Sequence, residues 1–227
     1  MNQIGTLSEK SIHSNIKDYL ESNKEYQEVK VGNYIADIKK DNQIIEIQTK
    51  NFKNLVNKIE YYLRCKYSIK IVYPIIMERY TNWIDPISHE IIERRKNPVK
   101  GSIQDILLEL YWVYKYLNNE LFELAIILIN AEEYKYLDGY GPNNKNKATK
   151  IDKVPTKIIK EITIKSIKDL KILIPETLPK EFNSTDFIKH SKCRKKWIGS
   201  GIKLLRELDV ITVVRKEGNS YIYRRNF

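Results

Sequence analysis

The chain has 227 residues, which is enough for one sizeable core and a small second domain. Its 42% hydrophobic and 30% charged residues are typical of a folded globular protein. A net charge of +11 favours a polyanionic partner, nucleic acid before membrane, although charge that serves only solubility is the alternative. Two distant cysteines argue against a paired zinc site and a disulfide framework. With no visible signal peptide or spanning apolar run, we expect a cytoplasmic protein and no membrane partner.

Hydrophobic periodicity predicts a mixed α/β order for the first part of the chain. The predicted elements are, in order, a helix over 6–21, a strand over 26–31, a hairpin over 34–50, a helix over 52–63, a buried strand over 68–73 ended by Pro74, an inserted hairpin over 80–95, a helix over 105–117, a buried strand over 122–129 and a loop over 140–153. The expected division is a first domain over 1–170 (core about 1–130, basic extension 131–170), a proline-containing linker over 171–180 and a second domain over 181–227.

The second domain is predicted to contain a short helix, a turn near Ser191, a longer helix and a hairpin with Gly218 at its tip. This order resembles a winged helix-turn-helix domain. From Glu176 to the end, 12 Lys and Arg stand against 6 Asp and Glu, so this segment is strongly basic. The residues expected to contact duplex DNA are Lys192, Arg194, Lys195, Lys196, Ser200, Lys203, Arg215, Lys216 and Arg224. The alternative is a winged helix used for protein contact, with a solvated charge run.

The hairpin over 34–50 carries the most informative pattern. Asp41-Asn42 is a suitable two-residue turn, because both residues tolerate positive φ. Closing the hairpin there pairs Lys40 with Gln43, Lys39 with Ile44, Ile38 with Ile45 and Asp37 with Glu46. Like charges directly opposed at roughly 4.5–5.5 Å are destabilising, and the second strand is otherwise apolar. Two anions in such a place need a cation or a proton between them, so a divalent metal site is expected.

Each candidate also has a purely structural interpretation. Asp37 and Glu46 could pair with Lys39 or Lys50 as surface charges. Thr6-Leu-Ser-Glu9 forms a capping box in which Glu9 would only satisfy a backbone donor, although Glu9 also lies three residues before Ile12 on the buried stripe. His13, His89 and His190 show no ligand spacing and are interpreted as ordinary polar residues.

A helix, a three-strand meander, a helix, a strand, a helix and a strand, with Asp37 and Glu46-x-Gln48 on adjacent strands, resemble the PD-(D/E)XK nuclease superfamily. This superfamily includes restriction endonucleases and Holliday junction resolvases, and the resemblance covers about residues 1–130. Ile35-Ala-Asp37-Ile and Glu46-Ile-Gln48-Thr, followed by a C-terminal winged helix, also resemble a bacterial family of uncharacterised two-domain proteins. The resemblance implies a restriction-endonuclease-like α/β core with a mixed sheet. It also implies that Asp37 and Glu46 bind Mg²⁺ or Mn²⁺ and that Glu9 completes the site.

The sequence departs from the superfamily pattern at two positions. Ala36 stands where the motif has proline, a residue that contributes little chemistry. Gln48 stands where a lysine usually orients or activates the attacking water. Lys50, two residues later and so on the same face of a continuing strand, could supply the missing charge. In a second register, which stays open, Gln48-Thr-Lys50 resembles the Gln-x-Lys variant of methylation-dependent restriction enzymes, and Glu46 lies one step before the motif.

Two functions therefore compete. The expected one is a metal-dependent DNA endonuclease whose catalytic residues are Glu9, Asp37, Glu46, Gln48 and Lys50. The C-terminal domain would anchor it on duplex DNA, and a homodimer is a possible form of the enzyme. The alternative is a DNA-binding regulator or accessory factor that keeps the nuclease fold only as a scaffold. The intact Asp37 and Glu46 favour the first, and the missing motif lysine favours the second. The form of the nucleic-acid substrate stays open.

Overall fold

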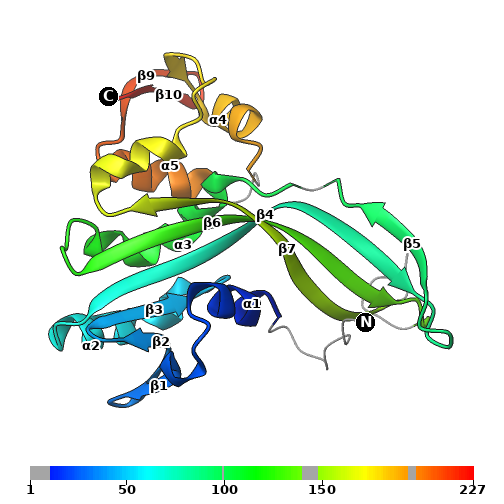
Figure 1. Cartoon of the computed structure of the whole chain (residues 1–227). Coiled ribbons are helices and arrows are strands. Elements are labelled where there is room, and N and C mark those ends of the chain that lie inside the picture. The colour runs from blue at the N-terminus through cyan, green and yellow to red at the C-terminus, as the bar shows by residue number, and fades with distance from the viewer. Residues whose placement is uncertain (1–10, 99, 140–147, 194–197) are drawn as a thin grey trace.

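The computed structural model describes residues 11–98, 100–139, 148–193 and 198–227, and it has the mixed α/β architecture expected from the sequence (Figure 1). The strand order of the main sheet is β1-β2-β3-β4-β6-β7, with β5 also paired to β4. Its seven strands are β1 (Gln27–Val31), β2 (Tyr34–Lys40), β3 (Gln43–Ile47), β4 (Ser68–Ile84), β5 (Ile91–Lys96), β6 (Phe122–Tyr136) and β7 (Thr149–Ile164). β3, β4 and β6 are parallel, whereas the other pairings are antiparallel.

The predicted hairpin forms between β2 and β3. Lys40 pairs with Gln43, Lys39 with Ile44 and Ile38 with Ile45, as expected. Asp41 has φ 50°, a conformation that Asp and Asn adopt more readily than most residues. The backbone pairing of the two strands ends at Ile38 and Ile45, so the predicted pairing of Asp37 with Glu46 is not formed.

The prediction that Pro74 ends the fourth strand is wrong, because β4 continues through Pro74 to Ile84. β6 pairs with β4 along one edge from Ile69 to Ile84. On the opposite edge, β3 pairs with the beginning of β4 and β5 with its end, which leaves residues 73–79 between them. A proline has no N–H to donate and is tolerated where a strand edge is open, which explains how the strand passes through it.

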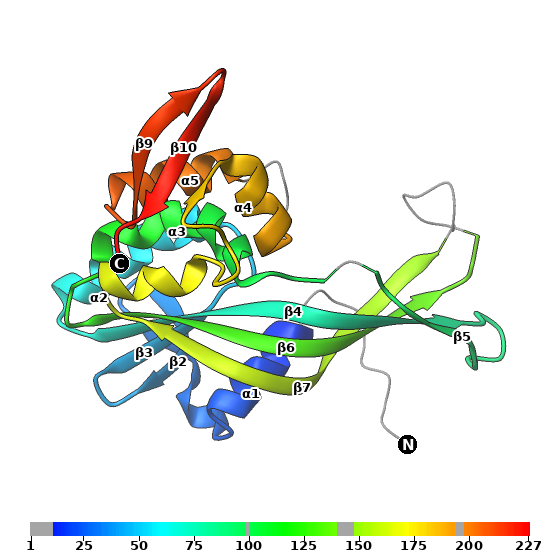
Figure 2. The same cartoon turned by 90° about the horizontal axis from the view of Figure 1, so that it is seen from above.

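The long strands extend past β3 as an arm, here defined as residues 79–84, 91–96, 130–136 and 149–157 (Figures 1 and 2). The predicted inserted hairpin is present as the end of β4 with β5. The prediction of a loop over 140–153 is wrong for residues 149–153, which belong to β7, and residues 140–147 lie outside the described part of the chain. The Lys- and Asn-rich composition of this segment concealed the start of a strand.

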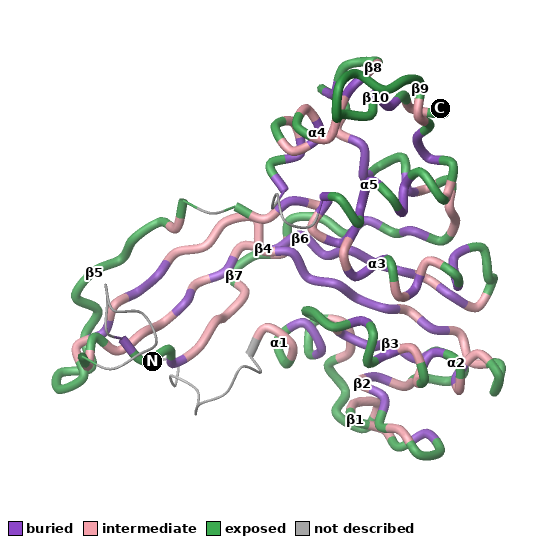
Figure 3. The backbone as a smooth tube through the Cα atoms, turned by 180° about the vertical axis from the view of Figure 1, so that it is seen from behind, coloured by how far each residue is buried: buried purple, intermediate pink, exposed green. Residues whose placement is uncertain are grey.

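Two layers of helices enclose the central sheet. The helices of this part are α1 (Ser11–Leu20), η1 (Lys24–Tyr26), η2 (Phe52–Leu55), α2 (Val56–Arg64), η3 (Ile103–Ile106), α3 (Leu107–Val113), η4 (Tyr114–Tyr116) and η5 (Ile167–Leu173). Ile16 of α1 packs on one face with Ile38 and Ile47. Ile59 of α2 and Leu110 of α3 belong to the larger core on the other face, and the central strands between the two layers are the most buried (Figure 3).

The C-terminal part has the predicted order of helix, helix and hairpin. Its elements are β8 (Glu181–Phe182), α4 (Ser184–Ser191), α5 (Ile198–Glu207), β9 (Ile211–Glu217) and β10 (Ser220–Arg225), and the order of its small sheet is β8-β10-β9. Its core continues into the larger core of the first part. A Cβ atom on Gly201 of α5 would lie 3.0 Å from Leu107 of α3, so the two helices approach closely. The segment 171–180, predicted as a linker, is itself packed through buried Leu173, Ile174 and Leu178.

Within the described ranges, no helix has the length and apolar character needed to cross a membrane.

Candidate functional site

Asp37 lies in β2 with its side chain 15% exposed. Its Oδ2 accepts a hydrogen bond from the Ile47 N–H at 2.7 Å and lies 3.0 Å from His13 Nε2. An ionised carboxylate only accepts hydrogen bonds, so His13 is the donor. Burial alone would raise the pKa of Asp37, but the hydrogen bond and charge of His13 and the Ile47 N–H outweigh it and hold this pKa below its usual range. Asp37 is therefore ionised and held in a fixed orientation.

Glu46 lies in β3, and only 4% of its side chain is exposed. Lys58 Nζ donates to its Oε2 at 2.7 Å, and the Tyr62 hydroxyl donates to its Oε1 at 3.4 Å. Burial raises the pKa of Glu46 to about 7, and the negative charge of Asp37 adds to this rise while Lys58 opposes it. The two carboxylates therefore interact electrostatically, although they are not paired along the backbone.

The partners of these carboxylates could not be predicted from the sequence. His13, interpreted as an ordinary polar residue, instead bonds to Asp37. Lys58 and Tyr62 are four residues apart and so lie on one face of α2, which brings both to Glu46. In the sequence, Lys58 stands directly before the buried Ile59, which places it beside the core. Only the tertiary structure shows that it contacts Glu46.

Two further predicted catalytic residues, Gln48 and Lys50, lie beyond the end of β3. Gln48 Nε2 donates to the backbone carbonyl of Lys50 at 2.5 Å, so the amide is turned toward the following loop. The prediction that Lys50 shares a strand face with Gln48 is wrong, because β3 ends at Ile47 and the alternation of a strand no longer applies. Glu9 lies outside the described residues.

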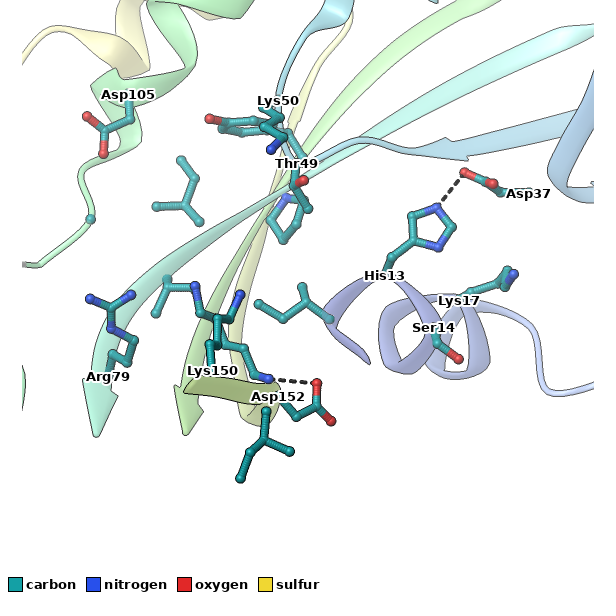
Figure 4. Close-up of a pocket in the computed structure, with 18 of the residues that line it drawn as sticks. His13, Ser14, Lys17, Asp37, Thr49, Lys50, Arg79, Asp105, Lys150 and Asp152 are labelled. Atoms are coloured by element: carbon teal, nitrogen blue, oxygen red, sulfur yellow. Dashed lines mark hydrogen bonds and ion pairs between the residues drawn. The ribbon is translucent and has the colours of Figure 1, made fainter. Parts of the chain in front are cut away.

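Asp37 faces a groove of about 1210 Å³ that runs along the open edge of β4 (Figure 4). One wall comes from α1, β1, β2 and the segment after β3, and the other from β4, the segment before η3 and the beginning of β7. The charged residues of the lining are Lys17, Glu28, Asp37, Lys50, Arg79, Lys100, Asp105, Lys150, Asp152 and Lys153. The six cations outnumber the four acids, so the groove favours an anionic ligand.

The described residues contain no group of three or more His, Cys, Asp or Glu side chains arranged to hold a metal ion. A pair of carboxylates nevertheless suits Mg²⁺, which prefers oxygen ligands, keeps several waters and is commonly bound through one or two carboxylates. Asp37 and the buried Glu46, whose pKa is raised in part by Asp37, therefore fit a hydrated divalent cation in the chemistry of their donor atoms.

The predicted DNA-contacting residues of the C-terminal part have varied surroundings. Ser200 and Lys203 lie on the exposed side of α5, opposite the buried Ile198, Ile202 and Leu205, as expected. Lys192 is exposed at the end of α4, and Lys216 lies over the Tyr221 ring. Arg194, Lys195 and Lys196 lie outside the described residues.

Two of the hairpin arginines share one acidic partner. Arg215 and Arg224 both donate to Glu181, the latter at 2.5 Å. The hydrogen bond from Arg215, followed by that from Arg224, lowers the pKa of Glu181 to about 2. The carboxylate thus competes with any phosphate for both arginines.

Comparison with known proteins identifies a family but no activity. No solved structure matches the chain. The chain is 25% identical over 226 residues to an "Uncharacterized protein" of Treponema pallidum (strain Nichols), and the similarity covers 98% of this chain and 87% of that protein. Residues 10–165 match a family described as "Domain of unknown function (DUF8091)". Since this match spans more than half of the 227 residues, the chain belongs to the DUF8091 family.

Proposed function

We propose that this protein is a metal-dependent DNA endonuclease with a restriction-endonuclease-like core. The observation that carries the proposal is the position of Asp37 on the wall of a basic groove, with the buried Glu46 close enough for Asp37 to raise its pKa. The two residues belong to adjacent strands of a mixed sheet, and the element order agrees with the resemblance to the PD-(D/E)XK superfamily.

Each residue has a chemical role in this proposal. A bound Mg²⁺ or Mn²⁺ would neutralise phosphate charge and lower the pKa of a water. Asp37 and Glu46 hold the cation, and Glu9 is the residue that the resemblance assigns to complete the site. His13 keeps Asp37 oriented through their 3.0 Å hydrogen bond. Lys58, 2.7 Å from Glu46, provides an ammonium group beside the carboxylates, where the motif lysine is replaced by Gln48.

The direct test is incubation of the protein with plasmid, linear and branched DNA, each with Mg²⁺, with Mn²⁺ and with a chelator. Metal-dependent nicking or linearisation supports the proposal, and the preferred DNA form identifies the substrate. If none of these forms and no RNA is cut with either metal, the endonuclease proposal is wrong.

A second candidate is a DNA-binding factor that keeps the nuclease-like fold as a scaffold. Two observations favour it. Both oxygens of Glu46 already have partners in Lys58 and Tyr62, and the Gln48 amide is turned to the carbonyl of Lys50. This candidate predicts duplex binding that is the same with Mg²⁺ and with a chelator.

In both candidates we propose that the C-terminal part, similar to a winged helix-turn-helix, is an anchor for duplex DNA. Its exposed Lys203 and the hairpin Arg215 and Arg224 are among the described cations that we assign to phosphate contact. Removing residues after Pro179 would not test this cleanly, because Phe182 and Phe187 belong to the continuous core and their loss would expose it. Substitutions at the surface are the appropriate test.

Glu181→Gln is expected to strengthen duplex binding severalfold, because Arg215 and Arg224 would lose an anionic competitor for phosphate. Each additional phosphate contact should steepen the salt dependence by about 0.9 log unit per log unit of salt. Fluorescence anisotropy at several salt concentrations measures both effects. Glu120→Gln, the same charge change on an exposed residue of the first part, is the control. Equal gains in both variants would mean that only net charge matters and that the hairpin does not touch DNA.

A further inference from the structure

The arm carries an unusual concentration of positive charge around one carboxylate. Glu133 of β6 has a side chain only 7% exposed. Its Oε2 lies 3.3 Å from Lys135 Nζ and 3.8 Å from Arg79 Nε, and its Oε1 lies 3.9 Å from Lys153 Nζ. One carboxylate cannot neutralise three cations, so this part of the arm keeps an excess of positive charge.

Strand register adds a fourth cation to this cluster. Glu133 faces Lys153 across the β6–β7 pair, but Lys135 faces Lys150. Like charges directly opposite in an antiparallel pair are destabilising. Burial lowers the pKa of Lys153, the charge of Glu133 opposes this, and the charges of Arg79, Lys150 and Lys135 lower the pKa further. An anion bound here would relieve this repulsion.

Three of these four cations, together with Asp152, line the groove. Arg79, Lys150 and Lys153 line the groove, whose opposite wall carries Asp37 and His13 (Figure 4). The cationic wall includes the open edge of β4, where backbone hydrogen bonds from Asn97 and Gly101 replace a neighbouring strand. The groove is therefore a channel with a cationic wall facing the candidate catalytic carboxylate.

We propose that the arm is a nucleic-acid-binding wall: Arg79, Lys150 and Lys153 bind backbone phosphates of duplex DNA that lies in the groove against Asp37. This inference builds on the proposed endonuclease function and deepens it by assigning the groove to the DNA backbone. The contacts are electrostatic and to phosphate, so they position the duplex without reading its sequence. A polyanion suits the arrangement better than a single small anion, because the cations are distributed along two strands of the arm.

The test compares two double variants of β7 in the full chain. Lys150→Ala with Lys153→Ala removes two groove cations, and Lys157→Ala with Lys160→Ala removes two exposed cations of the same strand that do not line the groove. Both variants change the net charge equally. Binding of a fluorescent duplex is measured with a chelator present, so that no cleavage takes place.

We expect the groove variant to bind about tenfold more weakly and its salt slope to fall by up to about 1.8, or about 0.9 for each lost phosphate contact. The control variant should keep the slope of the wild type. Lys150→Glu, a change at an exposed position, provides a second groove variant in case loss of the half-buried Lys153 impairs folding. Equal binding by the groove and control variants would overturn the inference.

Two further outcomes distinguish a duplex-binding wall from a small-anion pocket and from the nuclease activity itself. If a few millimolar inorganic phosphate displaces the duplex and sodium chloride of equal ionic strength does not, the cluster is a small-anion pocket and the inference is wrong. If the groove variant loses binding and the wild type cuts no nucleic acid, the arm is still a duplex-binding wall while the endonuclease proposal fails.

Discussion

Asp37→Asn is expected to abolish metal-dependent DNA cleavage while leaving folding and duplex binding nearly unchanged. The asparagine side chain keeps an oxygen that can accept the Ile47 N–H, so the local hydrogen bond survives. It removes the negative charge that faces the groove and would hold the cation. Charge stabilisation of about 4 kcal/mol corresponds to a loss of about a thousandfold in the cleavage rate.

The measurement is single-turnover cleavage of the preferred DNA form, accompanied by anisotropy binding in a chelator and by thermal unfolding. Asp41→Asn is the matched control, because it makes the same charge change at the exposed turn of the same hairpin, where φ is 50° and asparagine is tolerated. A cleavage rate for Asp37→Asn within a few-fold of the control would remove Asp37 from the catalytic site.

The local features of this fold could be predicted from the sequence. Asp41-Asn42 determined the hairpin register, because a two-residue turn leaves one pairing for the residues beside it. Apolar periodicity likewise located α2 around Ile59 and the helix order of the C-terminal part. In each case the structure is determined by residues that are close together in the sequence.

The features that could not be predicted depend on contacts between distant segments. A proline usually ends a strand. Pro74 instead lies at an edge of β4 that neither β3 nor β5 covers, and this gap exists only once the sheet has formed. The beginning of β7 is rich in lysine, and its pairing with β6 overrides that composition. His13 reaches Asp37 from a helix 24 residues away in sequence, and no spacing rule relates the two.

The candidate site shows the same division. The sequence identified the two carboxylates and the strands that carry them, but not the cation beside Glu46. Lys58 matters because it opposes the rise in the pKa of Glu46, whose value of about 7 lies close to neutrality. A carboxylate must be ionised to bind a metal, so the charge of Lys58 bears directly on whether Glu46 can be a ligand.

Lys58→Met is expected to lower the free energy of unfolding by about 3 kcal/mol at about pH 8.5 and by much less at about pH 5.5, because it leaves a buried carboxylate without its counter-charge. In the wild type the pKa of Glu46 rises from 4.5 to about 7 on folding. Between these values the unfolded chain has released the proton that the folded chain keeps, so the contribution of Glu46 to stability falls as the pH rises. Without Lys58 the folded pKa lies higher still, so this loss continues above pH 7 in the variant alone.

Urea denaturation of both proteins across this pH range measures the effect, and the double variant Lys58→Met with Glu46→Gln separates its causes. The double variant has neither the ammonium nor the ionisable carboxyl group. The stability of Lys58→Met should therefore fall relative to that of the double variant as the pH rises above about 4.5, because Glu46 of the unfolded single variant ionises while its buried folded carboxyl group keeps the proton. At about pH 5.5 the two variants should still agree to within about 2 kcal/mol, because this pH lies only one unit above the pKa of 4.5 of the unfolded carboxyl group and one unit corresponds to about 1.4 kcal/mol. Equal destabilisation of Lys58→Met at both pH values would mean that Lys58 contributes packing alone, and Glu46 would then not depend on it to be ionised at neutral pH.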